Sequence, residues 1–526
     1  MSNLENVAYA ATDVSMAESQ RKKATMEGSN EPSLLPTSDV KDYDLSEAEQ
    51  QITAAGEAKY SRLSWKQLTL MLIVDAIALG ALSIPQAFAT LGMIAGVVCC
   101  VGIGLIAVYT SWIIGKVKLA FPSVQHYGDV GGLLLGRVGY EIFSAVFVIQ
   151  LIFVVGSHCL TGTIAFATIT ESTICSLVFG IVSAIILFLL SIPSSFADIT
   201  LLGYIDFASI LIAIGITIIA TGIQGSNSPG GLGAVAWSAF PKENITFTEA
   251  YVAIGDIVFA YSFATCQFSF MEEMHTPTDF TKSIWVLGLI EIIIYTVTGA
   301  TIYAFVGSDV QSPALLSAGT TVSRIAFGVA LPVIFISGSI NSIVVGRLLH
   351  TRVYKNSVIR YINTPKGWIT WIIFVAAITI VAWIIAEAIP FFTDLLSIIS
   401  ALFTSGFSFY LPPIMWLTLL CKGKWFSKEN LPFAIINFLV FLMGLAVLVC
   451  GLYSSIDDIV SFVSWKNGID LFSNNLCSAT LIAQAGFGVL SAVLSRDISC
   501  LHLERKWFLL GAWKGRDGLL RKAGMN

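Results

Sequence analysis

Charged residues, histidines and ordered cysteine patterns are scarce in this chain of 526 residues. Only 12% of the residues are charged, the formal net charge is −5 and the basic residues are not clustered, so we expect no nucleic-acid partner. The five histidines form no HExxH-type pair, and the nine cysteines show no metal-binding or disulfide spacing. Because a nucleophile–base motif is missing as well, we expect neither an enzyme nor a bound metal or cofactor.

Apolar residues dominate instead. They make up 56% of the sequence, and the mean hydropathy is +0.80. This composition predicts an all-α polytopic membrane protein, because a run of about 20 apolar residues is enough to cross a bilayer. We expect about eleven transmembrane helices, which lie near residues 68–90, 93–115, 141–167, 174–192, 200–223, 249–270, 284–306, 323–346, 368–389, 393–419 and 431–453.

The first 60 residues form a polar segment without hydrophobic periodicity. No basic stretch followed by an apolar run is present, so this segment does not resemble a signal peptide. We expect a disordered cytosolic tail. Lys22, Lys23 and Lys41 are candidate regulatory sites, where trafficking machinery could act, and a plain solvated tail is the alternative. The transmembrane domain is expected over residues 61–455.

Lysine and arginine residues gather in alternate loops and predict a cytosolic N-terminus. Residues 224–248, which contain a glycosylation sequon at Asn244, then lie on the external side of the membrane. The C-terminal segment, 456–526, is atypical because it is basic although eleven spans would place it outside. A twelfth, weakly apolar helix at 477–494 would place it inside, and both alternatives stay open.

Two of the expected spans contain a carboxylate followed by helix-weakening residues. In the first span Asp75 precedes Gly80 and Pro85, and in the sixth Asp256 precedes a run of small and polar residues from Ala260 onward. A broken helix at membrane depth is tolerated only where its backbone groups are buried or line a cavity. We therefore expect both helices to be broken at a binding site, with a simple kink as the alternative for the first.

Several segments of the chain resemble the amino acid/auxin permease family. They occur in the family's order across residues 60–460, and they are 79–85 (LGALSIP), 259–261 (FAY), 273–280 (EMHTPTDF), 312–315 (SPAL) and 388–392 (AIPFF). The likeness is greatest to filamentous-fungal neutral amino acid permeases of the methyltryptophan-resistance type. The chain departs from many members after FAY, where it reads Ser262-Phe263-Ala264 in place of Gly-His, and beyond residue 475.

The resemblance implies a LeuT-like fold, in which a 5+5 inverted repeat with broken helices 1 and 6 is followed by one further helix. It also implies amino acid uptake, usually driven by protons. A free helix end beyond Gly80 would offer N–H groups to a substrate carboxylate, and carbonyls near Ala260 would accept its ammonium. The expected substrate-binding residues are Gly80, Ala81, Leu82, Ser83, Ala260, Tyr261, Ser262 and Phe263. The two aromatic residues could equally be plain packing.

A proton-coupling group should be an ionisable residue inside the membrane. We favour Asp75, with Asp256 and Glu291 as the other candidates, and pairing or capping as the structural alternative for Asp75. His158 is expected to be a hydrogen-bonded core residue. The first span carries no amide or hydroxyl cluster that would indicate a sodium site, so proton coupling is preferred.

The sequence thus predicts a multi-pass plasma-membrane permease that imports neutral aliphatic or aromatic amino acids by proton symport with alternating access. Its expected partners are the substrate, protons and the lipid bilayer. Two alternatives remain open at this point. One is a vacuolar exporter of the same fold, and the other is a sensor that binds amino acids without transporting them.

Overall fold

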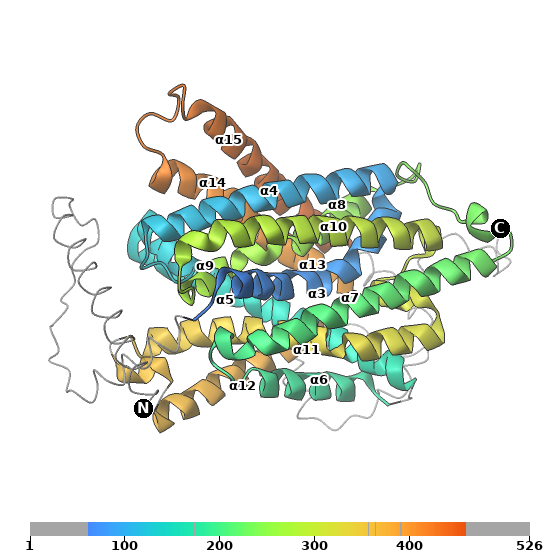
Figure 1. The fold of residues 1–526 in the computed structure, drawn as a ribbon, viewed down its shortest axis with the longest axis horizontal. Coiled ribbons are helices and arrows are strands. Elements are labelled where there is room, and N and C mark those ends of the chain that lie inside the picture. Colours follow the sequence, from blue (N-terminus) through green and yellow to red (C-terminus); the bar gives the residue numbers. More distant parts are fainter. Residues whose placement is uncertain (1–61, 172–173, 356, 363, 390–391, 459–526) are drawn as a thin grey trace, which may run out of the picture. The chain divides into compact units, whose positions relative to one another are not determined.

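A computed structural model describes residues 62–171, 174–355, 357–362, 364–389 and 392–458. All of them belong to one unit, Ile52–Asn526. Figure 1 shows long helices that run side by side in this part of the chain. The tail expected at 1–60 and the possible helix at 477–494 lie outside the described residues.

The helices of the described part confirm the all-α architecture. The α-helices are α3 (Trp65–Leu91), α4 (Met93–Ala120), α5 (Tyr127–Thr170), α6 (Ser176–Leu190), α7 (Phe196–Asn227), α8 (Phe247–Ala260), α9 (Gln267–Glu272), α10 (Phe280–Val306), α11 (Thr320–Val353), α12 (Pro365–Ala388), α13 (Phe392–Ile399), α14 (Leu411–Met415) and α15 (Leu431–Ala446). Short 3₁₀ turns are η1 (Gly231–Ala234), η2 (Ser262–Thr265), η3 (Pro277–Asp279), η4 (Gly307–Asp309), η5 (Ala314–Ala318) and η6 (Val358–Tyr361). Three π-helical segments are η7 (Ser400–Tyr410), η8 (Trp416–Leu420) and η9 (Val447–Gly451).

Every apolar run identified in the sequence is helical. Within the described residues, nine helices are long and apolar enough to cross a membrane. The run expected at 174–192 corresponds to α6, which has only 15 residues, and the run at 249–270 corresponds to α8, η2 and α9 together. The prediction of about eleven spans therefore agrees with nine long helices, one short helix and one interrupted helix.

The core of the bundle is built around α3. In its most apolar 18-residue window 94% of the residues are buried, against 22% for the helix that ends the described part of the chain. α3 packs against α7, α8, α10 and α11, and Figure 1 shows it among these helices. The outer helices instead expose large apolar side chains, such as Leu201 on α7 at 72% and Val138 on α5 at 67%. This distribution is the one expected where lipid replaces water around the bundle.

Gly92 forms a tight corner between α3 and α4. Its φ of +81° is in the left-handed region that favours glycine, and a Cβ there would lie 2.5 Å from the Phe240 carbonyl carbon. The loop that contains Phe240 is also bonded to the start of α4, because Met93 N–H donates to Ser238 O at 2.9 Å and Ile94 N–H donates to Ala239 O at 3.0 Å. The backbone of this loop therefore packs against Gly92 and is hydrogen-bonded to the first two residues of α4.

The wide helical segment η7 leaves one backbone carbonyl without a main-chain donor. The Leu411 N–H donates to Gly406 O, five residues earlier. In this register the Phe407 carbonyl would need a donor from residue 412, which is a proline without an N–H. The Tyr127 hydroxyl supplies the missing donor at 2.6 Å. A side chain from α5's first turn thus supports the irregular helix that faces the break in span six.

Candidate functional site

The sixth span is interrupted at its middle, as the sequence predicts. α8 ends at Ala260, and Tyr261 leaves helical geometry with φ −98° and ψ 34°. The turn η2 follows, and the chain then resumes as α9. A glycine or proline is not needed for this break, since the small and polar residues of η2 do not enforce a continuous helix.

The break predicted in the first span is wrong. α3 is one α-helix from Trp65 to Leu91, with Pro85 inside it. Pro85 has no N–H to donate to the carbonyl of Ala81, but membrane helices tolerate such a residue where neighbouring helices surround it. The N–H groups of residues 80–83 consequently lie within a helix. They do not form the free helix end that we expected to bind a carboxylate.

Gly80 nevertheless lies directly against the break. A Cβ added at Gly80 would lie 2.8 Å from both Cα and Cβ of Ala260. The Ser83 hydroxyl donates to the Gly80 carbonyl at 3.1 Å, and the side chains of Ala81, Leu82 and Ser83 are fully buried. The absence of a side chain at Gly80 therefore lets α3 approach the end of α8 at backbone distance.

A small cavity lies between α3, α5, η2 and α11. Its free volume is about 10 Å³, which is about the room that one water molecule needs. Of the residues expected to bind substrate or protons, only Asp75 and Ser262 line it. The other lining residues are Ala76, Leu79, Gln150, Leu151, Val154, His158, Phe259, Thr265, Cys266 and Asn341.

Asp75 is the acidic residue of this cavity and belongs to a hydrogen-bond network. Its Oδ1 accepts from Asn341 Nδ2 at 2.9 Å, and the same amide also donates to Ser337 O at 3.2 Å. The Cys266 thiol donates to Asn341 Oδ1 at 3.7 Å. His158 bonds to the Ile334 carbonyl through Nδ1 at 2.7 Å, so it is a hydrogen-bonded core residue, as predicted. Asn341 is one of the residues that the sequence interpretation missed.

Gln150 provides the polar group on the α5 side of the cavity. Its Nε2 donates to Thr265 Oγ1 at 3.2 Å and to Thr404 Oγ1 at 3.4 Å. Thr265 belongs to the break and Thr404 belongs to η7, so one amide joins the two irregular segments across the cavity. All three side chains are buried.

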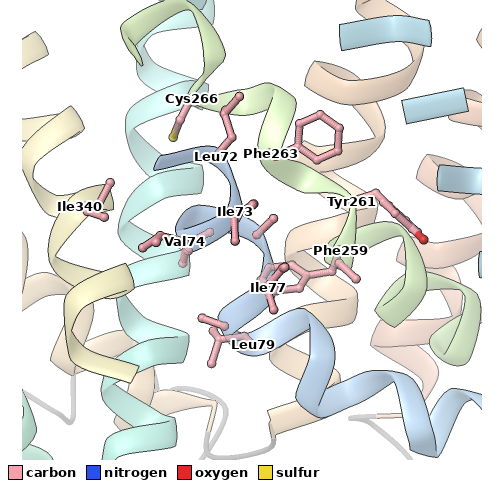
Figure 2. Close-up of a cluster of buried hydrophobic side chains, with 14 of the residues drawn as sticks. Leu72, Ile73, Val74, Ile77, Leu79, Phe259, Tyr261, Phe263, Cys266 and Ile340 are labelled. Atoms are coloured by element: carbon pink, nitrogen blue, oxygen red, sulfur yellow. The ribbon is translucent and has the colours of Figure 1, made fainter. Parts of the chain in front are cut away.

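The carbonyl at the end of α8 is occupied by a tyrosine. Tyr295 on α10 donates its hydroxyl to Ala260 O at 3.0 Å, and its ring meets the ring of Tyr261 edge-on at a centroid distance of 5.1 Å. Figure 2 shows Tyr261 directed away from α3, while Phe259 and Phe263 lie in the apolar cluster around it. The expectation of a free carbonyl at Ala260 is therefore wrong in this structure.

The remaining two proton-coupling candidates lie outside the cavity. Asp256 is buried on α8, one turn before its end. Glu291 is fully buried on α10, one turn before Tyr295, on the far side of the break. Of the three candidate carboxylates, the structure thus brings only Asp75 to the cavity.

The end of the bundle where Glu273 lies is closed by a buried ion pair. Glu273 has no exposed surface, and its carboxylate accepts from Arg347 Nη1 on α11 and from the N–H groups of Phe196 and Ala197 at 3.4 and 3.3 Å. Burial raises the pKa of Glu273, which follows the last residue of α9, while the Arg347 charge opposes that rise. One carboxylate thus ties the start of α7 and the end of α11 to α9.

The same end is also fastened by main chain. Leu63, fully buried, donates its N–H to Glu273 O at 2.8 Å and accepts from His275 N–H at 2.9 Å. Next to it, Lys118 Nζ forms an ion pair with Glu272 and donates to Val124 O at 2.5 Å. Leu63, which lies two residues before the start of α3, is therefore part of the closure.

The chemistry of the site is that of polar recognition inside an apolar bundle. Among the described residues, no group of three or more His, Cys, Asp or Glu side chains could hold a metal ion. The cavity offers a carboxylate, two amides, two hydroxyls, a thiol and an imidazole, set among Leu79, Leu151, Val154 and Phe259. Such a mixture suits a small ligand that combines charged groups with an apolar part.

Comparison with known proteins gives the family. A family model described as "Transmembrane amino acid transporter protein" matches residues 61–457. The "N amino acid transport system protein" of Neurospora crassa is 60% identical over 407 residues, which cover 77% of this chain and 87% of that protein. A "Transmembrane transporter" of Fusarium pseudograminearum is 26% identical over 436 residues, covering 83% and 90%. One of Gibberella moniliformis is 25% identical over 413 residues, covering 75% and 84%. The chain therefore belongs to the family of transmembrane amino acid transporter proteins.

Proposed function

We propose that this transporter imports neutral amino acids by proton symport with alternating access. The observation that carries the proposal is the position of Asp75 beside the interrupted span, in a cavity buried between four elements. Interrupted helices with an ionisable residue at mid-membrane are how many secondary transporters bind a substrate and its coupling ion. The name of the Neurospora crassa relative, which refers to amino acid transport, supports the substrate class.

The preference for neutral side chains follows from the lining of the cavity. Leu79, Leu151, Val154 and Phe259 offer apolar surface, and no lysine or arginine is among the lining residues. An aliphatic or aromatic side chain gains by leaving water for such a surface, whereas a charged one would need a partner. In this proposal the carbonyls of the break accept the substrate ammonium. The amides of Gln150 and Asn341 each exchange one of their present acceptors for the substrate carboxylate.

Coupling is assigned to Asp75, because its carboxylate lines the cavity and is partly accessible there. A charged carboxylate inside the bundle costs free energy, and binding a proton removes that cost. The proton and the substrate then enter the same cavity, so loading one changes the electrostatic environment of the other. Asn341 holds Asp75 in place on the side of α11.

Alternating access requires that one end of the bundle closes while the other opens. We assign the closed Glu273 end to the cytosol, since the loops with most lysine and arginine lie there in the predicted orientation. With this assignment the N-terminus is cytosolic. Because we propose an importer, we place the protein in the plasma membrane. Opening toward the cytosol would break the Glu273–Arg347 pair and the main-chain bonds of Leu63.

The test is uptake of labelled neutral amino acids, either by cells that express the protein or by proteoliposomes that contain the purified protein. We expect accumulation when the outside is more acidic, and its loss when a proton uncoupler is added. Labelled lysine and glutamate serve as controls, and they should accumulate poorly. Binding without any transport would contradict the proposal in favour of a sensor, and uptake that is insensitive to the uncoupler would contradict proton coupling.

A further inference from the structure

Two buried polar side chains behind the α8 break lack partners. Both carboxylate oxygens of Glu291 and the hydroxyl of Tyr261 make no hydrogen bond within the described residues. Both side chains are fully buried, at 0% exposure. A buried polar group without a partner is costly, and a charged one costs much more, so such groups are rare in native structures. A pair of them at one place points to a function.

The geometry places these groups next to the carbonyl that ends α8. Glu291 and Tyr295 are four residues apart on α10, so their side chains share one face of the helix. The Tyr295 ring meets the Tyr261 ring at 5.1 Å, and its hydroxyl donates to Ala260 O at 3.0 Å. A phenol has a single proton to donate. Tyr295 can therefore serve either Ala260 or Glu291 as a donor, but not both.

We propose that the protonation of Glu291 decides which acceptor the Tyr295 hydroxyl serves. While Glu291 carries a proton, Tyr295 donates to Ala260, as the structure shows. When Glu291 loses this proton, its carboxylate is the stronger acceptor, because hydrogen bonds to a charged group are about twice as strong as neutral ones. Tyr295 then turns to Glu291, and the Ala260 carbonyl, freed of this competing donor, offers both of its lone pairs to the substrate ammonium. This inference rests on the proposed function, in which the break binds that ammonium.

The surroundings of Glu291 favour such a switch. The ionisable groups that interact with Glu291 or with the two tyrosines are Asp75 from α3 and Cys100 from α4. Neither can neutralise a carboxylate, so the phenols are left to stabilise its charged form. The other acidic residues with described side chains on elements packed against α10 are Asp206 on α7, Asp279 in η3 and Asp309 in η4.

The structure corresponds to the state in which Glu291 is protonated and Tyr295 donates to Ala260. Tyr295 occupies the Ala260 carbonyl, and the cavity beside the break has a free volume of only about 10 Å³. Releasing the carbonyl also loosens the contact between α8 and α10. Glu291 would thus act on substrate binding through Tyr295, as a positioning residue that never touches the substrate.

The experiment measures substrate exchange across proteoliposome membranes at equal pH on both sides, so that no proton gradient is involved. The variants are Glu291→Gln, Tyr295→Phe and their combination. We expect Glu291→Gln to raise the KM for exchange about tenfold, which is the loss of one charge-assisted hydrogen bond. Tyr295→Phe should keep a low KM, because its Ala260 carbonyl is always free, and the double variant should behave like Tyr295→Phe.

This rescue distinguishes a switch from a merely structural role. If the tenfold defect of Glu291→Gln persists in the double variant, or if Glu291→Gln has the wild-type KM, the inference is overturned. Tyr295→Phe alone gives an independent check, since it should remove the fall of KM that the wild type shows as the pH rises. Tyr303→Phe is the matched control, because it lies on the same helix and its hydroxyl accepts from Ser238 N–H at 2.9 Å, away from the break.

The outcome for the wild type separates the two proposals. If the wild type exchanges neutral amino acids and the variants do not behave as expected, only the switch fails. If the wild type exchanges no neutral amino acid, the proposed function fails, and the switch is overturned with it.

Discussion

Gly80→Ala adds one methyl group where α3 meets the break, and we expect it to weaken substrate binding more than the fold. The new Cβ would lie 2.8 Å from Ala260 Cα and Cβ and 3.1 Å from the Tyr295 hydroxyl. Ordinary contact begins at 3.4 Å, so α3 and α8 would have to separate by about 0.6 Å in an interior that is packed as densely as a crystal.

The size of the effect follows from two opposing contributions. Overpacking of this kind costs about 1–3 kcal/mol, and replacing glycine by alanine within a helix returns about 1 kcal/mol. The net loss of stability is then about 0–2 kcal/mol. If the strain falls wholly on the break, the same free energy corresponds to substrate binding that is weaker by up to about 30-fold. Gly80→Val, with its larger and stiffer side chain, should abolish transport.

The assay compares surface expression, melting temperature in detergent and the KM for uptake. Gly102→Ala and Gly215→Ala are matched controls, because a Cβ at either position meets no atom within 4 Å. Both should be transported to the membrane and function like the wild type. A Gly80→Ala variant with wild-type KM and uptake would refute the reasoning that the close contact with Ala260 positions the break.

Three further predictions concern other parts of the bundle. Asp75→Asn should abolish accumulation driven by a pH gradient while exchange survives, and gradient-driven uptake by a correctly sorted variant would remove Asp75 from the coupling role. Arg347→Gln should lower the melting temperature, since removing one partner of a buried ion pair costs about 3–5 kcal/mol. Adding Glu273→Gln should recover part of this loss, and an unchanged melting temperature in the single variant would contradict the closure. Tyr127→Phe leaves the Phe407 carbonyl without its donor, at a cost of about 1–3 kcal/mol, which thermal melting would detect; no change in melting temperature would show that this bond does not stabilise η7.

The transmembrane architecture could be predicted from the sequence because it depends on local composition. Each apolar run became a helix, and the small, polar residues after Ala260 correctly indicated the break in span six. The conformation of the first span was harder to predict, because Gly80 and Pro85 permit a break in the helix without requiring one. Whether Pro85 breaks α3 depends on how well the surrounding helices cover the carbonyl that it leaves unbonded, and that packing is not encoded locally.

The candidate site was predicted only in part for the same reason. Asp75 could be identified from its cost inside a membrane, whereas Asn341 is 266 residues away in the sequence. Tyr295 gives no signal as a donor to Ala260, since an aromatic residue in an apolar run is usually plain packing. The spacing of Glu291 and Tyr295, four residues apart, was the one pattern that could have suggested a shared helix face.

The corner at Gly92 has a mechanical consequence for the whole length of α3. With 27 residues, α3 is about 40 Å long, at 1.5 Å per residue. If the corner stays clamped by the backbone of the loop at Phe240, a rotation of about 10° displaces the start of α3 by about 7 Å, but Gly80 by only about 3 Å. α3 then pivots about Gly92. A small rotation at the Gly92 end therefore produces a large displacement at the opposite end of the helix, where Leu63 lies.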